Sequence, residues 1–184
     1  MSWFARLFRS EPEKIAAERL YAALVAQARE PAFYRDGVVP DSLDGRFELV
    51  ALHAFLLLRR LRAEGQAGAR LAQALFDRMF VDMDESLREI GVGDLSVGKR
   101  VKAMAKAFYG RAAAYEAALA DSAPATLEQA LARNLYGTLP GRQGLPLTAM
   151  ARYLRQAAAE IGDQPAASLM AGQVNFPIFC LESR

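Results

Sequence analysis

The stretch with the most recognisable chemistry is Gly93–Lys99, which reads GDLSVGK. Its spacing of glycines and lysine begins like a P-loop, in which backbone N–H groups cradle phosphates and a following Ser or Thr binds Mg²⁺. Arg100 stands where that hydroxyl is required. A P-loop also follows a strand, whereas the residues before Gly93 have a helical pattern. We therefore interpret the stretch as a turn between two helices, with glycines that permit positive φ and Ser96 as a helix cap.

An acidic cluster that reads DMDE begins at Asp82 and suggests a metal site. The glycine and the final glutamate of an EF-hand calcium loop are not found at the required positions. On a helix, Asp82, Glu85 and Glu89 share one face, which predicts a solvated acidic surface. Asp84 and Arg88 are four residues apart and predict a surface ion pair.

The chain has one histidine, His53, and one cysteine, Cys180. A single histidine excludes a His-rich metal site and paired histidine ligation of a haem within one chain. His53 lies beside an apolar stripe, which favours a hydrogen-bonded, partly buried ring over a catalytic one. Cys180 has no evident base beside it. We expect no catalytic residue, no metal and no cofactor.

Helices must position these residues, because apolar residues recur at three- and four-residue spacing and strand-type alternation is nearly absent. Helix starts are marked by capping patterns at four places: Ser10, Asp41 or Ser42, Ser96 and Thr126. We predict six helices: from residue 11 to Pro31, from the loop at 37–46 to near Gly65, and over about 67–90, 96–119, 126–136 and 148–161.

The predicted architecture is an all-α, bundle-like single domain of about six helices. Residues 11–172 form this domain. They follow an amphipathic basic segment at 1–10 and precede an extended tail at 173–184.

Composition narrows the class of protein further. Lys and Arg number 23, Asp and Glu number 21, and the surplus of +2 comes from Arg6 and Arg9. A nearly neutral body argues against a dedicated DNA-binding protein, which usually needs a strongly basic face. The longest apolar run, near Leu49–Leu58, is about half of the ~20 residues that a membrane span needs. With no secretory signal and a single cysteine, we expect a soluble, cytoplasmic protein in a reducing compartment.

Charge is distributed unevenly along the predicted helices. Lys99, Lys102 and Lys106 share the helix face opposite Val101, Met104 and Phe108. One interpretation is that this basic face and the acidic face of the preceding helix offset each other within the fold. The other is a basic ridge that docks on an acidic partner or on RNA phosphate. The candidate docking residues are Lys99, Arg100, Lys102, Lys106, Tyr109 and Arg111, with Asp82, Glu85 and Glu89 on the acidic side.

The first ten residues have the composition of an interfacial membrane anchor. Trp3, Phe4, Leu7 and Phe8 fall on one side of a short helix, and Arg6 and Arg9 lie beside them. Apolar and aromatic residues next to arginines favour contact with anionic lipid. The alternatives are a frayed end and a segment docked on its own domain.

Two longer stretches carry a family resemblance. Residues 41–61 read DSLDGRFELVALHAFLLLRRL, and residues 73–111 read QALFDRMFVDMDESLREIGVGDLSVGKRVKAMAKAFYGR. The characteristic features are the DGRFE and LH pair, the LFD that follows, and the long block that ends in AFYGR. Through these features the chain resembles the ubiquinol–cytochrome c chaperone family over most of residues 20–140. We expect no mitochondrial-type extension before this region, which would be consistent with a bacterial member.

The resemblance implies a non-enzymatic assembly factor that binds newly made cytochrome b for the bc1 complex. Mitochondrial members act with a small partner protein and associate with the ribosome near the peptide exit, and neither property is visible in the residues here. A peripheral position on the inner membrane is compatible with the N-terminal segment. The alternative is a ribosome- or RNA-associated helical adaptor with a different client.

Deletion of residues 1–10 is expected to weaken binding to anionic liposomes, because it removes the clustered aromatic residues and both surplus arginines. Liposome co-sedimentation of the full and shortened chains measures this, and circular dichroism checks that the fold is unchanged. Equal liposome binding by both chains would rule the anchor out.

Overall fold

A computed structural model describes residues 11–35, 38–137 and 146–181. The residues named above for the N-terminal anchor, and Ser10, lie outside these ranges. The described chain is all-α, as the periodicity predicts. Its elements are α2 (Glu11–Ala28), η1 (Pro31–Phe33), α3 (Leu43–Arg62), α4 (Gly65–Glu89), α5 (Asp94–Ala120), α6 (Pro124–Asn134), α7 (Leu147–Asp163) and α8 (Ala166–Met170).

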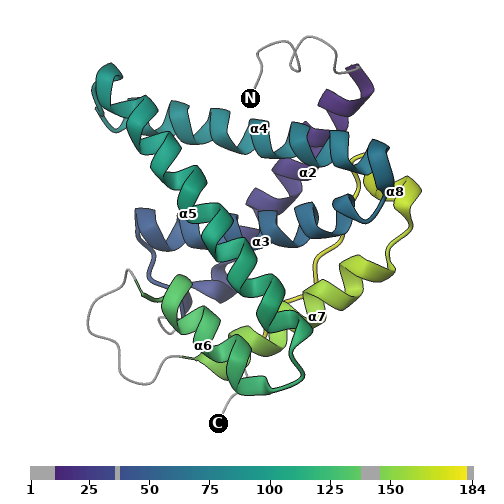
Figure 1. Cartoon of the computed structure of the whole chain (residues 1–184). Helices are drawn as coiled ribbons and strands as arrows, with labels where there is room; N and C mark the ends of the chain where they lie inside the picture. Colours follow the sequence, from purple (N-terminus) through teal and green to yellow (C-terminus); the bar gives the residue numbers. More distant parts are fainter. Residues whose placement is uncertain (1–10, 36–37, 138–145, 182–184) are drawn as a thin grey trace.

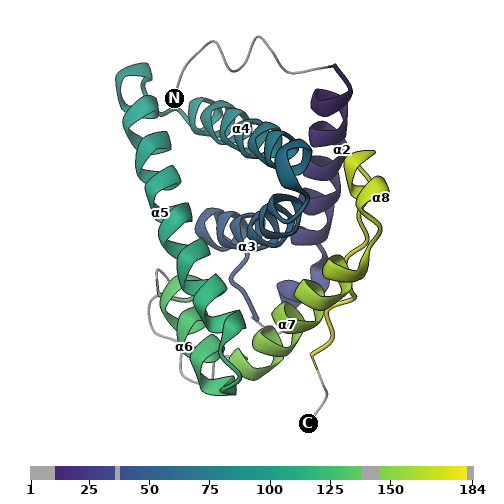
Figure 2. The same cartoon turned by 45° about the vertical axis from the view of Figure 1, so that its right-hand side comes forward.

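The helices form one bundle with a projecting hairpin (Figure 1). Helices α2, α3 and α4 pack against one another, and α6 pairs with α7 at the opposite end of the molecule. Helix α5 runs from the α4–α5 turn down to α6, so that it connects the two ends. Figure 2 shows from a second side that the α4–α5 turn stands away from α6 and α7. Among the described helices, none combines the length and the apolar character needed to cross a bilayer.

Several predicted helix ends are confirmed by the backbone. Ser42 caps α3, because its hydroxyl accepts a hydrogen bond of 3.1 Å from the N–H of Gly45. Gly91 ends α4 with a φ of +85°. There the N–H of Val92 donates to the carbonyl of Leu87 (3.0 Å) and the N–H of Gly91 donates to that of Arg88 (2.9 Å). This pair of bonds is a Schellman motif, which favours glycine at the left-handed position.

Two predicted caps are wrong, and two short helical elements, η1 and α8, were missed. Helix α5 begins after Gly93, so Ser96 lies within its first turn. Helix α6 begins at Pro124 without a side-chain cap, and the hydroxyl of Thr126 instead donates to Asp121 (2.7 Å). The five-residue α8 has too few residues to show a periodic pattern.

The apolar run in α3 is explained by burial on almost every side of that helix. Leu49, Leu52 and Leu57 have no exposed surface, and Glu48 and His53 are also buried. A helix that is apolar all round is expected in the interior, and here α2, α4 and α7 surround it. The run that fell short of a membrane span is therefore the central helix of the bundle.

An aromatic cluster joins this central helix to the end of the chain. Phe33 stacks on Phe179 with ring centroids 4.7 Å apart, and Tyr153 meets both rings edge-on. The ring centroid of His53 lies 5.5 Å from that of Phe33 and 5.3 Å from that of Phe176. Residues 171–181, the described part of the chain after α8, have no regular secondary structure, as predicted, but Phe179 is only 4% exposed. This part of the tail therefore belongs to the core.

His53 is fully buried, rather than partly buried as its sequence position suggests. Nδ1 lies 2.7 Å from the carbonyl of Leu49, which can only accept, so Nδ1 carries the proton. Nε2 then accepts from the hydroxyl of Tyr153 at 2.7 Å. Gln27 donates to that hydroxyl (3.1 Å) and to the carbonyl of Pro177 (3.0 Å). Both ring nitrogens of His53 and the hydroxyl of Tyr153 thus have hydrogen-bond partners, which makes the burial of the ring tolerable.

Burial lowers the pKa of His53 to about 4, although the Leu49 carbonyl opposes the shift. Below the ordinary pKa of 6.5, His53 binds a proton in the unfolded chain, whereas in the folded chain it stays neutral until the pH approaches 4. Stability is therefore expected to fall as the pH drops from about 6.5 to about 4, by about 3 kcal/mol in total. Urea denaturation at pH 7.5 and 5.5 measures the first part of this loss.

His53→Gln serves as the control, because glutamine keeps a polar side chain but does not titrate. Its stability should be lower at pH 7.5 and should change far less between the two pH values. An equal change in both proteins would show that other groups cause the pH dependence.

Candidate functional site

Helices α4 and α5 form a hairpin whose tip is fixed by one arginine. Arg88 donates to Asp84 at 2.6 Å, the ion pair that the four-residue spacing predicts, and also binds Asp94 across the turn. Leu87 and Val97 are buried near this tip but stand outside the main cluster of core side chains. Both side chains therefore bury apolar surface at the tip without belonging to the main core.

The side of the hairpin where α4 faces α5 carries a row of half-buried aromatic and methionine side chains. Phe76 lies 4.7 Å from Phe80 and 5.3 Å from Tyr109, measured between ring centroids. Tyr109 is 47% exposed, and Met83 and Met104 are half-buried. We call Phe76, Phe80, Met83, Met104 and Tyr109 the aromatic seam. Flexible methionines and partly exposed rings suit contact with apolar segments of varied shape.

The face of α5 opposite Met104 and Phe108 carries the predicted basic ridge, and Tyr109 lies at the margin of this face. Lys99, Lys102 and Lys106 are exposed and, with Leu95, follow a spacing of four, three and four residues. We call these four residues the lysine stripe. Within the described chain, no ion pair or side-chain hydrogen bond holds the three ammonium groups or the exposed Arg100. The cations are therefore available to a partner.

The acidic candidates lie on α4, on the side turned away from α5. Tyr21 of α2 donates to Asp82 at 2.7 Å, and Arg78 is 3.7 Å from the same carboxylate, so Asp82 helps to pack α2 on α4. Burial, followed by this hydrogen bond, raises the pKa of Tyr21. Glu85 and Glu89 are exposed. No described ion pair joins these acids to the lysine stripe, so the two charged faces do not neutralise each other by contact.

Arg111 is not part of the basic surface that the sequence suggested. Its Nε donates to Glu48 of α3 at 2.7 Å, and a second bond from Nη2 makes the contact bidentate. Glu48 is 3% exposed, and its burial raises the pKa of the carboxyl while Arg111 opposes the rise. Arg111 is therefore needed inside the fold to compensate a buried carboxylate.

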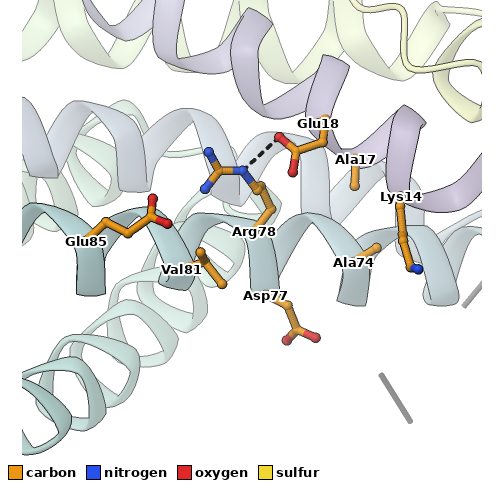
Figure 3. A pocket seen from close by; sticks show the side chains of 8 residues that line it. All are labelled: Lys14, Ala17, Glu18, Ala74, Asp77, Arg78, Val81 and Glu85. Carbon is orange, nitrogen blue, oxygen red and sulfur yellow. Dashed lines mark hydrogen bonds and ion pairs between the residues drawn. The ribbon is translucent and has the colours of Figure 1, made fainter. Parts of the chain in front are cut away.

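A groove of about 430 Å³ lies between α2 and α4. Its floor contains small apolar side chains, and Figure 3 shows Arg78 turned toward Glu18, with which it is paired at 2.8 Å. The lining residues are Lys14, Ala17, Glu18, Ala74, Asp77, Arg78, Val81 and Glu85. These include no serine, cysteine or histidine, and both nitrogens of the enclosed His53 are already hydrogen-bonded. The groove does not resemble a nucleophilic active site.

Sequence patterns located the lysines of the stripe but missed three features of this region. The exposure of Leu95, which is 99%, could be inferred only from its place on the same face as Lys99. The Tyr21–Asp82 and Glu48–Arg111 contacts join residues about sixty positions apart. Such long-range pairs leave no periodic signal in one sequence.

Comparisons with known proteins agree on one family. A sequence model described as "Ubiquinol-cytochrome C chaperone" matches residues 35–176. The crystal structure of the Cbp3 homolog from Brucella abortus is similar to this chain with a TM-score of 0.81 and 37% identity. That similarity covers 96% of this chain and 97% of that one.

Curated relatives carry names of the same kind. Ubiquinol-cytochrome-c reductase complex assembly factor 1 of Xenopus laevis is 28% identical over 122 residues, which are 66% of this chain and 60% of that protein. The human protein of that name is 27% identical over 103 residues, 56% of this chain and 34% of that protein. The chain thus matches less than two thirds of the length of these relatives.

Replacing Arg111 with methionine is expected to lower the free energy of unfolding by about 3 kcal/mol, because Glu48 would stay buried without its partner. Arg100→Met, at an exposed position of the same helix, should change it by less than about 0.5 kcal/mol. Urea denaturation of both variants tests this. Equal effects of the two changes would show that the buried pair does not matter for stability.

Proposed function

From the membership of this chain in the ubiquinol–cytochrome c chaperone family, we propose that it binds newly made cytochrome b during assembly of ubiquinol–cytochrome c reductase. The family is one of chaperones rather than enzymes. The family match over residues 35–176 supports the assignment most directly, because it includes the whole of α3 to α7. The names of the curated relatives support the same enzyme complex.

The aromatic seam is our candidate for the client-binding surface. A membrane protein that has not yet reached its final partners exposes apolar helices, and a chaperone must cover some of this surface. Phe76, Phe80 and Tyr109 form a connected row of rings, and Met83 and Met104 add flexible side chains. Flexible methionines let one surface accept several apolar sequences without a fixed pocket.

The position of the seam also fits a site that must release its client. It lies on a hairpin that is joined to the bundle along α4 and α5, while the buried network around His53 lies between α2, α3, α7 and the tail. Phe76, Phe80 and Met83 pack against the core, but binding at the hairpin involves no member of the network around His53. Because the client is a membrane protein, we also propose that the chain acts at the surface of the membrane in which cytochrome b matures.

Deleting the gene in the cell that makes this protein is expected to lower haem b absorbance and ubiquinol–cytochrome c reductase activity in isolated membranes several-fold. The wild-type gene should restore both. Unchanged levels of the mature complex in the deletion strain would contradict the proposed function.

A second comparison tests the seam separately. Phe80→Ser combined with Tyr109→Ser should fail to restore haem b, because the row of rings is lost. Ile178→Ser, at a tail position that is 83% exposed, should restore it fully. Thermal melts confirm that each variant is folded. Full restoration by a folded seam variant would show that the seam does not bind the client. It would not contradict the function proposed for the family.

A further inference from the structure

The outer face of α5 has a composition that neither the fold nor client binding requires. Leu95, Lys99, Lys102 and Lys106 lie within about 60° of one another around the helix and span about 16 Å along it. Leu95 is 99% exposed, the most exposed of the large apolar side chains in the described chain. An exposed apolar side chain beside three cations without a described partner suggests a ligand that offers both an apolar environment and negative charge.

The electric field at this face is not cancelled nearby. In the stretch 90–110 the only acid is Asp94, which is held by Arg88 at the tip. Glu85 and Glu89 belong to the side of α4 turned away from α5. The hairpin thus has one basic edge and one acidic edge, and the basic edge is complementary to a negatively charged surface.

We propose that the lysine stripe docks on the surface of a bilayer that contains anionic lipids, with Leu95 inserted among the headgroups. Lysines above anionic headgroups and a leucine at the acyl boundary are the pattern of interfacial helices. A Cβ added to Gly98 or Gly110 would meet no atom within 4 Å. The backbone of this helix is therefore open at two points and can approach a flat surface closely.

A bilayer fits these residues better than RNA does. Three of the four exposed cations are lysines, which act as point charges, whereas structured phosphates are usually recognised by the bidentate fork of arginine. RNA contact would also leave Leu95 without an apolar environment. Docking by this edge would place the α4–α5 turn, which projects from the bundle in Figure 1, at the membrane.

Local insertion can be measured with a fluorophore at the tip of the full chain. In a Cys180→Ser background, Leu95→Cys is labelled with an environment-sensitive nitrobenzoxadiazole dye. Ala113→Cys, eighteen residues further along the same face of α5, is the matched control. With vesicles of equal parts phosphatidylcholine and phosphatidylglycerol, emission at position 95 should rise several-fold and shift to the blue. No such change should occur at position 113 or with phosphatidylcholine alone.

An unchanged emission at position 95, or equal changes at positions 95 and 113, would overturn the proposal. Because the dye reports its own surroundings, vesicle binding by residues 1–10 alone would not produce the expected difference. The measurement also needs no client, so its outcome is independent of whether the chain binds cytochrome b.

Charge reversal separates lipid from RNA. Lys99→Glu, Lys102→Glu and Lys106→Glu together should lower flotation with the anionic vesicles at least tenfold, and raised salt should weaken the wild-type binding. Arg29→Glu, Arg35→Glu and Arg62→Glu change the net charge equally at exposed positions and should have a much smaller effect. Loss of ribosome co-sedimentation with unchanged flotation would show that the stripe binds RNA and would contradict the proposal.

Discussion

The neutral ring of His53 has to be enclosed without leaving any polar atom unpaired, and four separate segments of the chain meet to achieve this. Tyr153 of α7 donates to one ring nitrogen, and Gln27 of α2 connects Tyr153 to the backbone of the tail at Pro177. Phe33 and Phe179 close the cluster with stacked rings. Because each partner comes from a different element, the cluster fixes how α2, α3, α7 and the tail lie relative to one another. Loss of either hydrogen bond to the ring of His53 would leave a buried nitrogen unsatisfied.

With the core closed in this way, the hairpin of α4 and α5 is the element whose exposed side chains we assign to contact with other molecules. The hairpin is attached to α3 by the buried pair of Glu48 and Arg111, and its tip is ordered by Arg88 and the glycine turn at Gly91. Its inner side presents rings and methionines, whereas its outer sides carry opposite charges. Apolar contact and electrostatic docking are therefore assigned to adjoining faces of one structural element, which meet at Tyr109. A chaperone can use this arrangement to stay at one surface while it binds and releases a client.

The bundle was predictable where periodic patterns are long, and less so where contacts are distant. The helices α3, α4 and α5, the Ser42 cap and the Asp84–Arg88 pair follow from local spacing. The cap at Ser96 failed because the helix already begins at Asp94, and α8 depends on packing rather than on its five residues. The sequence pattern likewise placed Arg111 on the surface, because its contact with Glu48, 63 residues away, leaves no local signal. The family assignment came from long sequence blocks, which carry more information than any single motif.

The central claim is that newly made cytochrome b contacts the aromatic seam, and crosslinking in the native cell tests it most directly. A photoreactive amino acid at Tyr109 lies in the seam, and one at Ile178 lies on the exposed tail. After irradiation, the account predicts a crosslink between position 109 and cytochrome b that is absent at position 178, with the greatest yield while the subunit is being synthesised. A folded, expressed protein that gives no cytochrome b crosslink at position 109, or equal yields at the two positions, would contradict it.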